Sequence, residues 1–262
     1  SDAVDMVLAA HALGYDALGI ADVNSMAGVV RIHTEASTLK LRPVIGCRIE
    51  TVEGLAFLAY PKDRAAYGRL CRLISAGRMQ TLAGEWQDKG VCEIDLALLA
   101  AHSEGVQLIL LPPDDLDAQL TIAVPSNVIP FRRPGPDPEP FAESDPGQRR
   151  DEERDLPFAD LIPHLVSQLP TLKHIAASYL YRGDDIARIG RLDHLARVHG
   201  LSLLATNDVH YHAPERRALQ DVMTAIRHKT TVAAAGHLLH PNAERHLKSP
   251  AQMQRLFARW PH

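Results

Sequence analysis

Short apolar segments alternate with amphipathic helical segments along most of this chain, and this alternation restricts its fold more than any other feature. Strand character is found at residues 17–21, 43–50, 55–60, 106–111, 174–179 and 201–206. Helical periodicity is found at residues 1–13, 27–39, 63–79, 94–101 and 184–199. Two neighbouring strands are separated by a short turn at Gly54 and are expected to form a hairpin. The pattern predicts an α/β fold with parallel strands joined by crossover helices.

The alternation stops between about residues 125 and 165, where nine prolines occur. Residues 132–155 consist almost entirely of proline, glycine and charged side chains. Because such a composition buries too little apolar surface to order a chain, we expect a flexible insertion here, with an interdomain linker as the alternative. The same alternation resumes afterwards, which favours a single domain over residues 1–262.

The chain is expected to end in helices, over about residues 213–262. A capping-box sequence at Ser249 predicts the start of the last one. The helix before it is expected to bury one apolar face, formed by Leu219, Val222, Met223 and Ile226. Basic side chains cluster around that helix and could face DNA, although such charges more often form a solvated surface. They are Arg216, Arg217, Arg227, His228 and Lys229.

Bulk properties exclude several classes of protein. A net charge of −4 is unlike the strongly basic surface of free-standing nucleic-acid-binding proteins. The three cysteines are scattered without a Cys-x-x-Cys pair, which excludes a zinc ribbon and is typical of the reducing cytoplasm. Neither a membrane-spanning run nor a signal peptide is visible, so we expect a cytoplasmic protein with no membrane partner. Helical pattern begins at once at Ser1, so we expect a part of a longer protein.

A carboxylate and an imidazole follow the last predicted strand, in the stretch ATNDVHYH at residues 205–212. Asp208 and His210 are two residues apart, so in extended chain both side chains leave the same side of the backbone. This pair suits binding of a divalent metal or proton transfer, and in α/β barrels such chemistry collects at this end of the strands. The alternative is that Asp208 binds turn or helix donors and that the histidines are surface residues.

Three stretches together produce a resemblance to a known family. They are GIADVNSMAGVV at residues 19–30, ATNDVHYH at residues 205–212 and LHPNAERHLKS at residues 239–249. In this order and spacing they resemble the N-terminal PHP (polymerase and histidinol phosphatase) domain of bacterial DNA polymerases of the polymerase III alpha-subunit type. The resemblance is greatest to the error-prone branch, and it covers nearly all of the chain except the proline-rich insertion.

The resemblance implies a distorted (β/α)7 TIM-like barrel of the PHP type, with the first strand missing here. Active members of the family hold a cluster of divalent metal ions and cleave phosphoester bonds with a metal-bound water. The family's ligand positions correspond to Asp22, Asp208 and His210, which predicts a site for Zn, Mn or Mg.

Departures from the family pattern point to a degenerate metal site. The family's first strand, with its His-x-His pair, is absent, and Asn24 stands where active members tend to have histidine. Arg48 stands where a ligand glutamate is expected and adds a fixed positive charge to a site meant for cations. Glu50 points the same way and could substitute as a ligand. Arg48 could instead pair with Asp22 or Asp208 and hold the carboxylates that a metal would bind.

The resemblance implies a parent enzyme that is an error-prone DNA-directed DNA polymerase acting in damage-induced mutagenesis and translesion synthesis. Its catalytic residues, with Mg, would lie outside this chain, whose own role would be mainly structural. Implied partners are the remaining polymerase domains, DNA through the parent enzyme, and other mutagenesis or replisome proteins. The alternative is an active metal-dependent phosphoesterase that trims DNA 3′ ends or hydrolyses pyrophosphate or a small phosphorylated substrate. A free-standing binding module is the third possibility.

Overall fold

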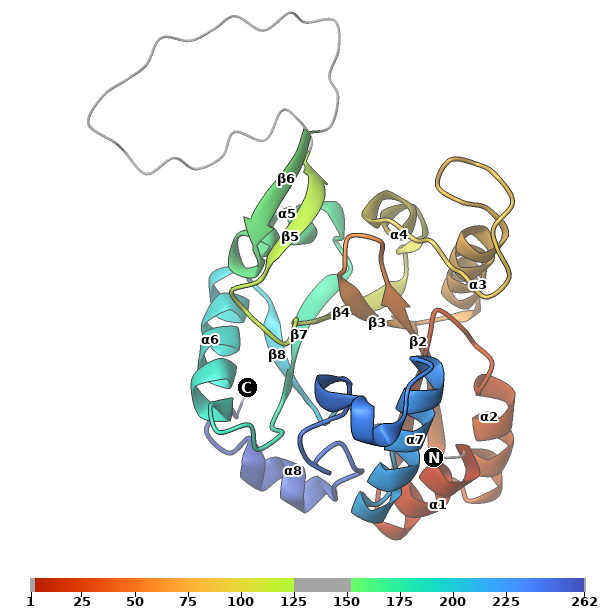
Figure 1. The fold of residues 1–262 in the computed structure, drawn as a ribbon, viewed down its shortest axis with the longest axis vertical. Helices are drawn as coiled ribbons and strands as arrows, with labels where there is room; N and C mark the ends of the chain where they lie inside the picture. Colours follow the sequence, from red (N-terminus) through yellow and green to blue (C-terminus); the bar gives the residue numbers. More distant parts are fainter. Residues whose placement is uncertain (1–2, 125–151, 262) are drawn as a thin grey trace, which may run out of the picture.

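A six-stranded mixed sheet forms the centre of the protein, whose computed structural model describes residues 3–124 and 152–261 (Figure 1). The strand order is β1-β2-β3-β4-β7-β8. The strands are β1 (Ala17–Val23), β2 (Arg42–Glu50), β3 (Ala56–Pro61), β4 (Val106–Leu111), β7 (Leu172–Ser178) and β8 (Ser202–Thr206). The pairs β1–β2, β4–β7 and β7–β8 are parallel, whereas β3 is antiparallel to both of its neighbours. The predicted hairpin is therefore confirmed as β2–β3, and β3 makes the sheet mixed rather than wholly parallel.

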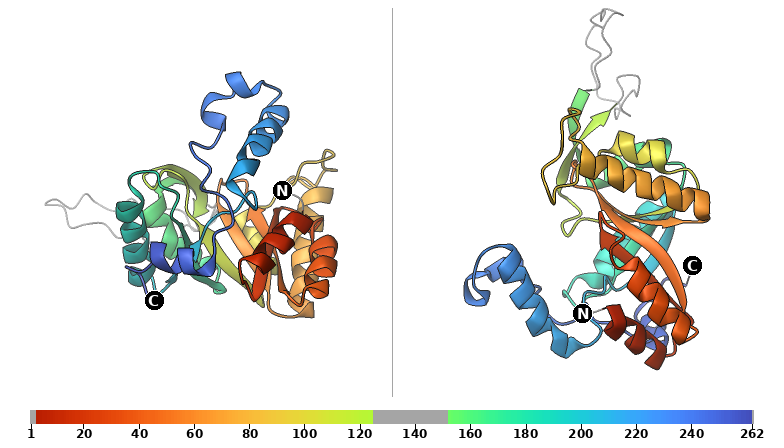
Figure 2. Two further views of the ribbon diagram at one scale, coloured as in Figure 1. Left: turned by 90° about the horizontal axis from the view of Figure 1, so that it is seen from below. Right: turned by 90° about the vertical axis from the view of Figure 1, so that its right-hand side faces the viewer.

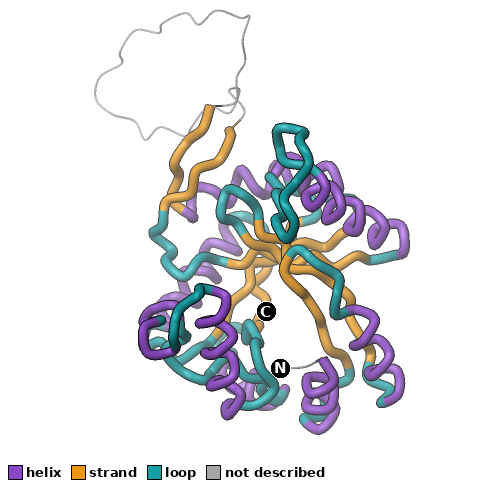
Figure 3. Tube along the Cα trace, turned by 45° about the vertical axis from the view of Figure 1, so that its right-hand side comes forward, coloured by secondary structure: helices purple, strands orange, loops and turns teal. Residues whose placement is uncertain are grey.

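Most helices lie around the outside of the curled sheet, and those between two strands connect them (Figure 3). They are α1 (Ala3–Ala12), α2 (Val29–Thr38), α3 (Arg64–Met79), α4 (Leu96–His102), α5 (Phe158–Gln168), α6 (Asp185–Val198), α7 (Arg217–Arg227) and α8 (Pro250–Leu256). Short 3-10 turns, η1 (Pro214–Arg216), η2 (Val232–Ala234) and η3 (Gly236–Leu238), lie on either side of α7. None of the helices in the described part of the chain is long and apolar enough to cross a membrane.

The two faces of the sheet have different surroundings because side chains alternate along each strand. Ile49 on β2 and Phe57 on β3 are fully buried in the main core, together with side chains of α3, α5 and α6. Their sequence neighbours Arg48 and Leu58 point to the opposite face, where both line a cleft. Helices thus cover the outer face of the sheet, and the inner face carries the cavities.

The sheet curls without closing, since β1 and β8 are its two edge strands. A cleft of about 730 Å³ lies between them, lined from β1 by Ala21 and Asp22 and from the end of β8 by Thr206 and Asp208. Six strands in a curled α/β sheet agree with the expected distorted barrel that lacks one strand.

The insertion was expected to extend to about residue 165, but regular structure resumes at residue 152. Residues 152–157 form β6, which pairs antiparallel with β5 (Gln119–Val124), and residues 158–168 form α5. Phe158 and Leu165 of α5 are fully buried, so this helix belongs to the core despite the proline within it. The remainder of the expected insertion, residues 125–151, lies outside the described residues.

The apolar face of α7 is exposed, contrary to the expectation that it would be buried. Leu219, Val222, Met223 and Ile226 are 49%, 44%, 54% and 66% exposed. Helix α7 and the turns after it stand out from the rest of the molecule (Figure 2), and the main contacts of α7 are with η1 and η2. Its sequence periodicity correctly indicated a helix with one apolar face, but nothing in the described part of the chain covers that face.

By contrast, the last helix forms as predicted. The Ser249 hydroxyl accepts a hydrogen bond from the Gln252 amide at 3.3 Å, and the Gln252 side chain accepts one from the Ser249 amide at 2.8 Å. Phe257 beyond the helix is buried in the main core, with Met253 and Trp260 packed against it. This packing anchors the segment before α8, which reaches the inner side of the sheet.

Candidate functional site

The two C-terminal stretches of the sequence resemblance lie against each other at the end of β8. The His210 amide donates to the Arg245 carbonyl at 2.9 Å, and the Leu247 amide donates to the Tyr211 carbonyl at 3.1 Å. Tyr211 is fully buried beneath this pairing. Residues 239–249 therefore act as an extra layer that fixes the chain immediately after Asp208.

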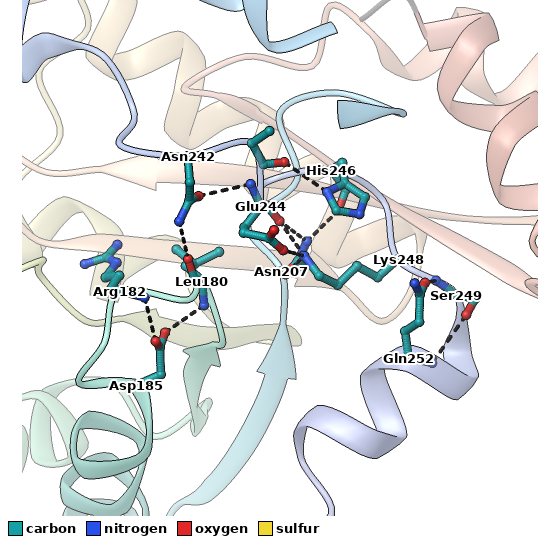
Figure 4. Close-up of polar contacts among 11 residues, drawn as sticks. Leu180, Arg182, Asp185, Asn207, Asn242, Glu244, His246, Lys248, Ser249 and Gln252 are labelled. Atoms are coloured by element: carbon teal, nitrogen blue, oxygen red, sulfur yellow. Dashed lines mark hydrogen bonds and ion pairs between the residues drawn. The ribbon is translucent and has the colours of Figure 1, made fainter. Parts of the chain in front are cut away.

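A buried polar network holds these two stretches together (Figure 4). The Asn207 side-chain amide donates to the carbonyls of Glu244, at 2.8 Å, and His246. The Lys248 ammonium is almost completely buried, donates to the Glu244 carbonyl at 2.6 Å and lies 3.0 Å from the Glu244 carboxylate. Because an unpaired ammonium would be costly at this depth, Lys248 and Glu244 depend on each other.

A second network positions the turn after β7 (Figure 4). The Asp185 carboxylate accepts hydrogen bonds from the amides of Leu180 at 2.7 Å and Arg182 at 2.6 Å. The Asn242 side chain donates to the Leu180 carbonyl at 2.7 Å, which ties this turn to residues 239–249. The Arg182 side chain then reaches Asp114, with 2.7 Å between Nη2 and Oδ1.

Asp208 is at the centre of the charged side chains at this end of the sheet. Its backbone adopts a left-handed conformation with φ of 42°, which turns the chain sharply after β8. The carboxylate forms an ion pair with Arg245, lies 3.7 Å from Arg48 Nη1 and lies 3.7 Å from His210 Nε2. The predicted pairing of Arg48 with Asp208 is therefore present.

The other two acidic candidates have partners of their own. The Asp22 carboxylate accepts a hydrogen bond from the Gly28 amide at 2.7 Å, just before α2 begins. Glu50 forms an ion pair with Arg48 at 2.9 Å. Asp22, Arg48, Asp208 and His210 all line the cleft between β1 and β8, so the structure gathers the predicted residues around one space.

Asn24, which stands where a histidine was expected, has a structural role. Its side-chain amide donates to the Glu50 carbonyl at 3.1 Å and accepts from the Glu50 amide at 3.0 Å. Like Asp208, Asn24 has a positive φ, of 43°, and it is buried. The pair of hydrogen bonds joins the end of β1 to the end of β2, a task that an imidazole could not perform in the same geometry.

Burial, together with neighbouring positive charges, lowers the pKa values of the basic groups at the site. Burial, with the nearby Arg182 and Arg48, lowers the pKa of Arg245 to about 10, against the opposing effect of Asp114. Burial and the neighbouring Arg48 also lower the pKa of His210. His240 packs edge-on against His210, with ring centroids 4.9 Å apart, and burial lowers its pKa as well. Both imidazoles are therefore expected to be neutral at pH 7.

This arrangement does not fit a metal cluster. Within residues 3–124 and 152–261, no group of three or more His, Cys, Asp or Glu side chains is placed to hold a metal ion. Asp208 is already neutralised by guanidinium groups, and Asp22 is bound to the start of α2. A divalent cation here would have to displace fixed positive charges that cannot lose a proton near neutral pH.

Beside Asp208 is a cavity of about 330 Å³ with an unusually cationic lining. Its arginines are Arg48, Arg182, Arg188 and Arg245. Only Arg48 among them is predicted from the sequence. Arg245 was visible within the stretch LHPNAERHLKS, but its acidic partner is 37 residues away, and no local pattern specifies that contact.

Comparisons with known proteins agree with this fold and these motifs. Residues 2–125 match the PHP domain family. This part of the chain is thus similar to PHP domains, and the described residues form a curled α/β sheet with helices around it. Among solved structures, one provisionally described as a metal-dependent phosphoesterase from Bifidobacterium adolescentis has a TM-score of 0.48 and 14% identity, covering 79% of this chain and 82% of that chain. A likeness of that size supports no argument about function.

The chain is also similar to error-prone DNA polymerases over nearly its full length. It is 36% identical to that of Caulobacter vibrioides over 100% of this chain and 39% identical to that of Rhodopseudomonas palustris BisB5 over 97% of it. It spans about one fifth of the length of these relatives, 20% and 19% respectively. The chain is therefore similar to one part of these error-prone DNA polymerases.

Proposed function

We propose that residues 1–262 form a single PHP domain in the N-terminal region of an error-prone DNA polymerase. The parent enzyme would extend a primer across damaged template in damage-induced mutagenesis, with Mg bound by residues outside this chain. Sequence similarity over nearly the whole chain to enzymes of that name supports this assignment. The compartment would then be the cytoplasm, and DNA would be reached through the parent enzyme.

Within that enzyme, the PHP domain has a structural role with a degenerate metal site. Asp22, Asp208 and His210 are its remaining ligand positions. The observation that carries this proposal is the contact of both Arg48 and Arg245 with Asp208, where guanidinium groups supply the positive charge that a metal would supply. Charge balance at the strand ends is then maintained by protein side chains alone.

The exposed apolar face of α7 is the proposed docking surface for the rest of the parent polypeptide. Leu219, Val222, Met223 and Ile226 form a continuous stripe on a helix that stands out from the domain. Contiguous exposed apolar surface of this kind is typical of an interaction site. About four fifths of the length of the relatives lies outside the matched region, which makes another domain of the same chain the fitting occupant.

Other partners are secondary in this proposal. The basic side chains around α7 could contact DNA next to the docked domain, and other mutagenesis or replisome proteins could bind the parent enzyme. Arg217 is already engaged within the domain, since it donates to the His240 carbonyl at 2.7 Å and pairs with Asp221. Arg227 and Lys229 are exposed and remain the stronger candidates for contact with phosphate.

Elemental analysis combined with a primer-extension assay tests the proposal. The full polymerase should extend a primer past an abasic site, and the purified PHP region should contain far less than one equivalent of zinc, manganese or iron. Phosphoesterase activity on DNA 3′ ends, with two or three equivalents of metal lost in the Asp208→Asn variant, would contradict the structural role. That result would establish the active phosphoesterase instead.

A further inference from the structure

The cavity beside Asp208 collects more positive than negative charge. Four arginines line it, against two carboxylates, Asp114 and Asp208. The two histidines of the lining are counted as neutral in this sum. The lining therefore carries a formal charge of +2, and Glu50, which pairs with Arg48, lies outside the lining. A cavity with this excess attracts anions, since clefts lined by one sign of charge concentrate the electrostatic field.

The guanidinium groups retain unused hydrogen-bond donors. Each guanidinium has five N–H groups. Arg188 uses two of its nitrogens, in bonds to the carbonyls of Pro113 at 2.5 Å and Asp114 at 2.8 Å. Arg182 uses one in its contact with Asp114, and Arg245 uses one in its contact with Asp208. The contacts that hold these side chains in place therefore leave donors available to a ligand.

Four different parts of the chain bring the arginines to this cavity. Arg48 comes from β2, Arg182 and Arg188 come from the turn after β7 and from α6, and Arg245 comes from the segment before α8. Each is fixed by a carboxylate or by backbone carbonyls rather than left mobile in solvent. Fixed donors cost little ordering entropy when an anion binds, which raises affinity.

We propose that this cavity binds a phosphate-bearing anion through its arginines, without a metal ion. Planar guanidinium groups match the oxygens of a phosphate in bidentate geometry, and several arginines around one cavity suit a group with more than one negative charge. A volume of about 330 Å³ is at the small end of ligand pockets and accommodates a phosphate or pyrophosphate group. That group can be a free anion or the terminal phosphate of a DNA strand.

Asp114 and Asp208 hold the arginines in the absence of the ligand. An entering phosphate would share the guanidinium groups with these carboxylates, and their negative charge limits how tightly it binds. Replacing Asp208 by asparagine raises the formal charge of the lining from +2 to +3 and should tighten binding. A metal site would show the opposite response, since asparagine is a weaker ligand for a cation than aspartate.

Calorimetric titration of the 262-residue chain with inorganic pyrophosphate, in metal-free buffer containing a chelator, tests the proposal. One equivalent should bind, and Arg188→Gln should weaken binding about tenfold or more, because it removes charged hydrogen bonds. The matched control is Arg191→Gln, on the same helix, where Arg191 pairs with Asp117 outside the cavity. Binding that is absent, or that both variants weaken equally, would overturn the proposal.

Arg182→Gln serves as a second variant in case the loss of Arg188 disturbs the loop that it holds. Thermal unfolding of each variant establishes that it is folded before titration. A folded Arg182→Gln protein that binds pyrophosphate as tightly as the unchanged chain would also overturn the proposal. Binding should weaken as salt increases, because the attraction is electrostatic.

Two oligonucleotides distinguish the sources of the phosphate. A short single strand with a 5′-phosphate is compared with the same strand carrying a 5′-hydroxyl, each in competition with pyrophosphate. Displacement by the phosphorylated strand alone would identify a DNA end as the ligand. Displacement by neither would identify the free anion, and equal displacement by both would contradict a terminal phosphate site on DNA.

Discussion

Replacing Asp208 by asparagine should destabilise the domain, and the size of the effect follows from the surroundings of the carboxylate. Asp208 is one-third exposed, at 32%, whereas its partner Arg245 is only 10% exposed. Removing one partner of a fully buried ion pair costs about 3–5 kcal/mol. Because water reaches Asp208, we expect about 2–3 kcal/mol here. For a domain of this size that corresponds to a lowering of the melting temperature by about 4–12 °C.

Chemical denaturation and thermal melting in metal-free buffer would measure this change. The control is Asp117→Asn, which breaks the exposed ion pair with Arg191 and should leave the melting temperature unchanged. The sign of the change in stability distinguishes a carboxylate compensated by arginines from one that belongs to an empty metal site. Carboxylates clustered to bind a metal repel one another when no metal is present, so removing one should leave stability equal or raise it. Equal or higher stability of Asp208→Asn would therefore refute the argument that arginines compensate this carboxylate.

Three further perturbations test individual features of the structure. Gly46→Ala should destabilise the protein by about 1–3 kcal/mol in urea denaturation, because a Cβ there would lie 2.4 Å from the Tyr60 ring; unchanged stability would show that the ring moves freely. Asn24→His, which restores the residue of active family members, should cost about 2–4 kcal/mol by the same measurement, because it removes both hydrogen bonds to the Glu50 backbone. Burial, followed by Arg48, lowers the pKa of His210, so the unfolded chain binds its proton more readily. Stability from this source is complete above the unfolded pKa near 6.5 and is lost as pH falls below it, so His210→Asn should flatten the decline in stability between about pH 7 and 5; an unchanged pH profile would contradict this.

Much of the fold could be predicted from local patterns. Strands buried on one or both faces, such as β4, are recognised in the sequence as short apolar runs. The capping box at Ser249 marks the start of α8. Strand β6 and helix α5 were missed because Pro157, Pro163 and the charged residues around them resemble an unstructured segment. Their order comes from tertiary packing, since Phe158 enters the core formed by distant strands.

The site could be predicted only in part. The resemblance to PHP domains placed Arg48 and Asp208 at one site, and their contact, one of the two pairings expected for Arg48, is present. The contribution of Arg245 depends on a chain reversal through α7 that no short pattern encodes. The orientation of α7 was missed for a related reason, because periodicity identifies an apolar face but cannot show whether the same domain covers it.

The open sheet gives this domain an unusual mechanical property. Asp22 and Asp208 lie at the ends of opposite edge strands, so their separation depends on the twist accumulated across every strand pair between them. The gap is spanned by side-chain contacts instead, including the bond from the Tyr15 hydroxyl to the Lys248 carbonyl and the packing of Leu247 on the core around α1. The width of the cleft between the two edges therefore depends on the curl of the sheet, whose outer surface is covered by helices. A force applied to that surface by a neighbouring domain would be transmitted to the width of the cleft.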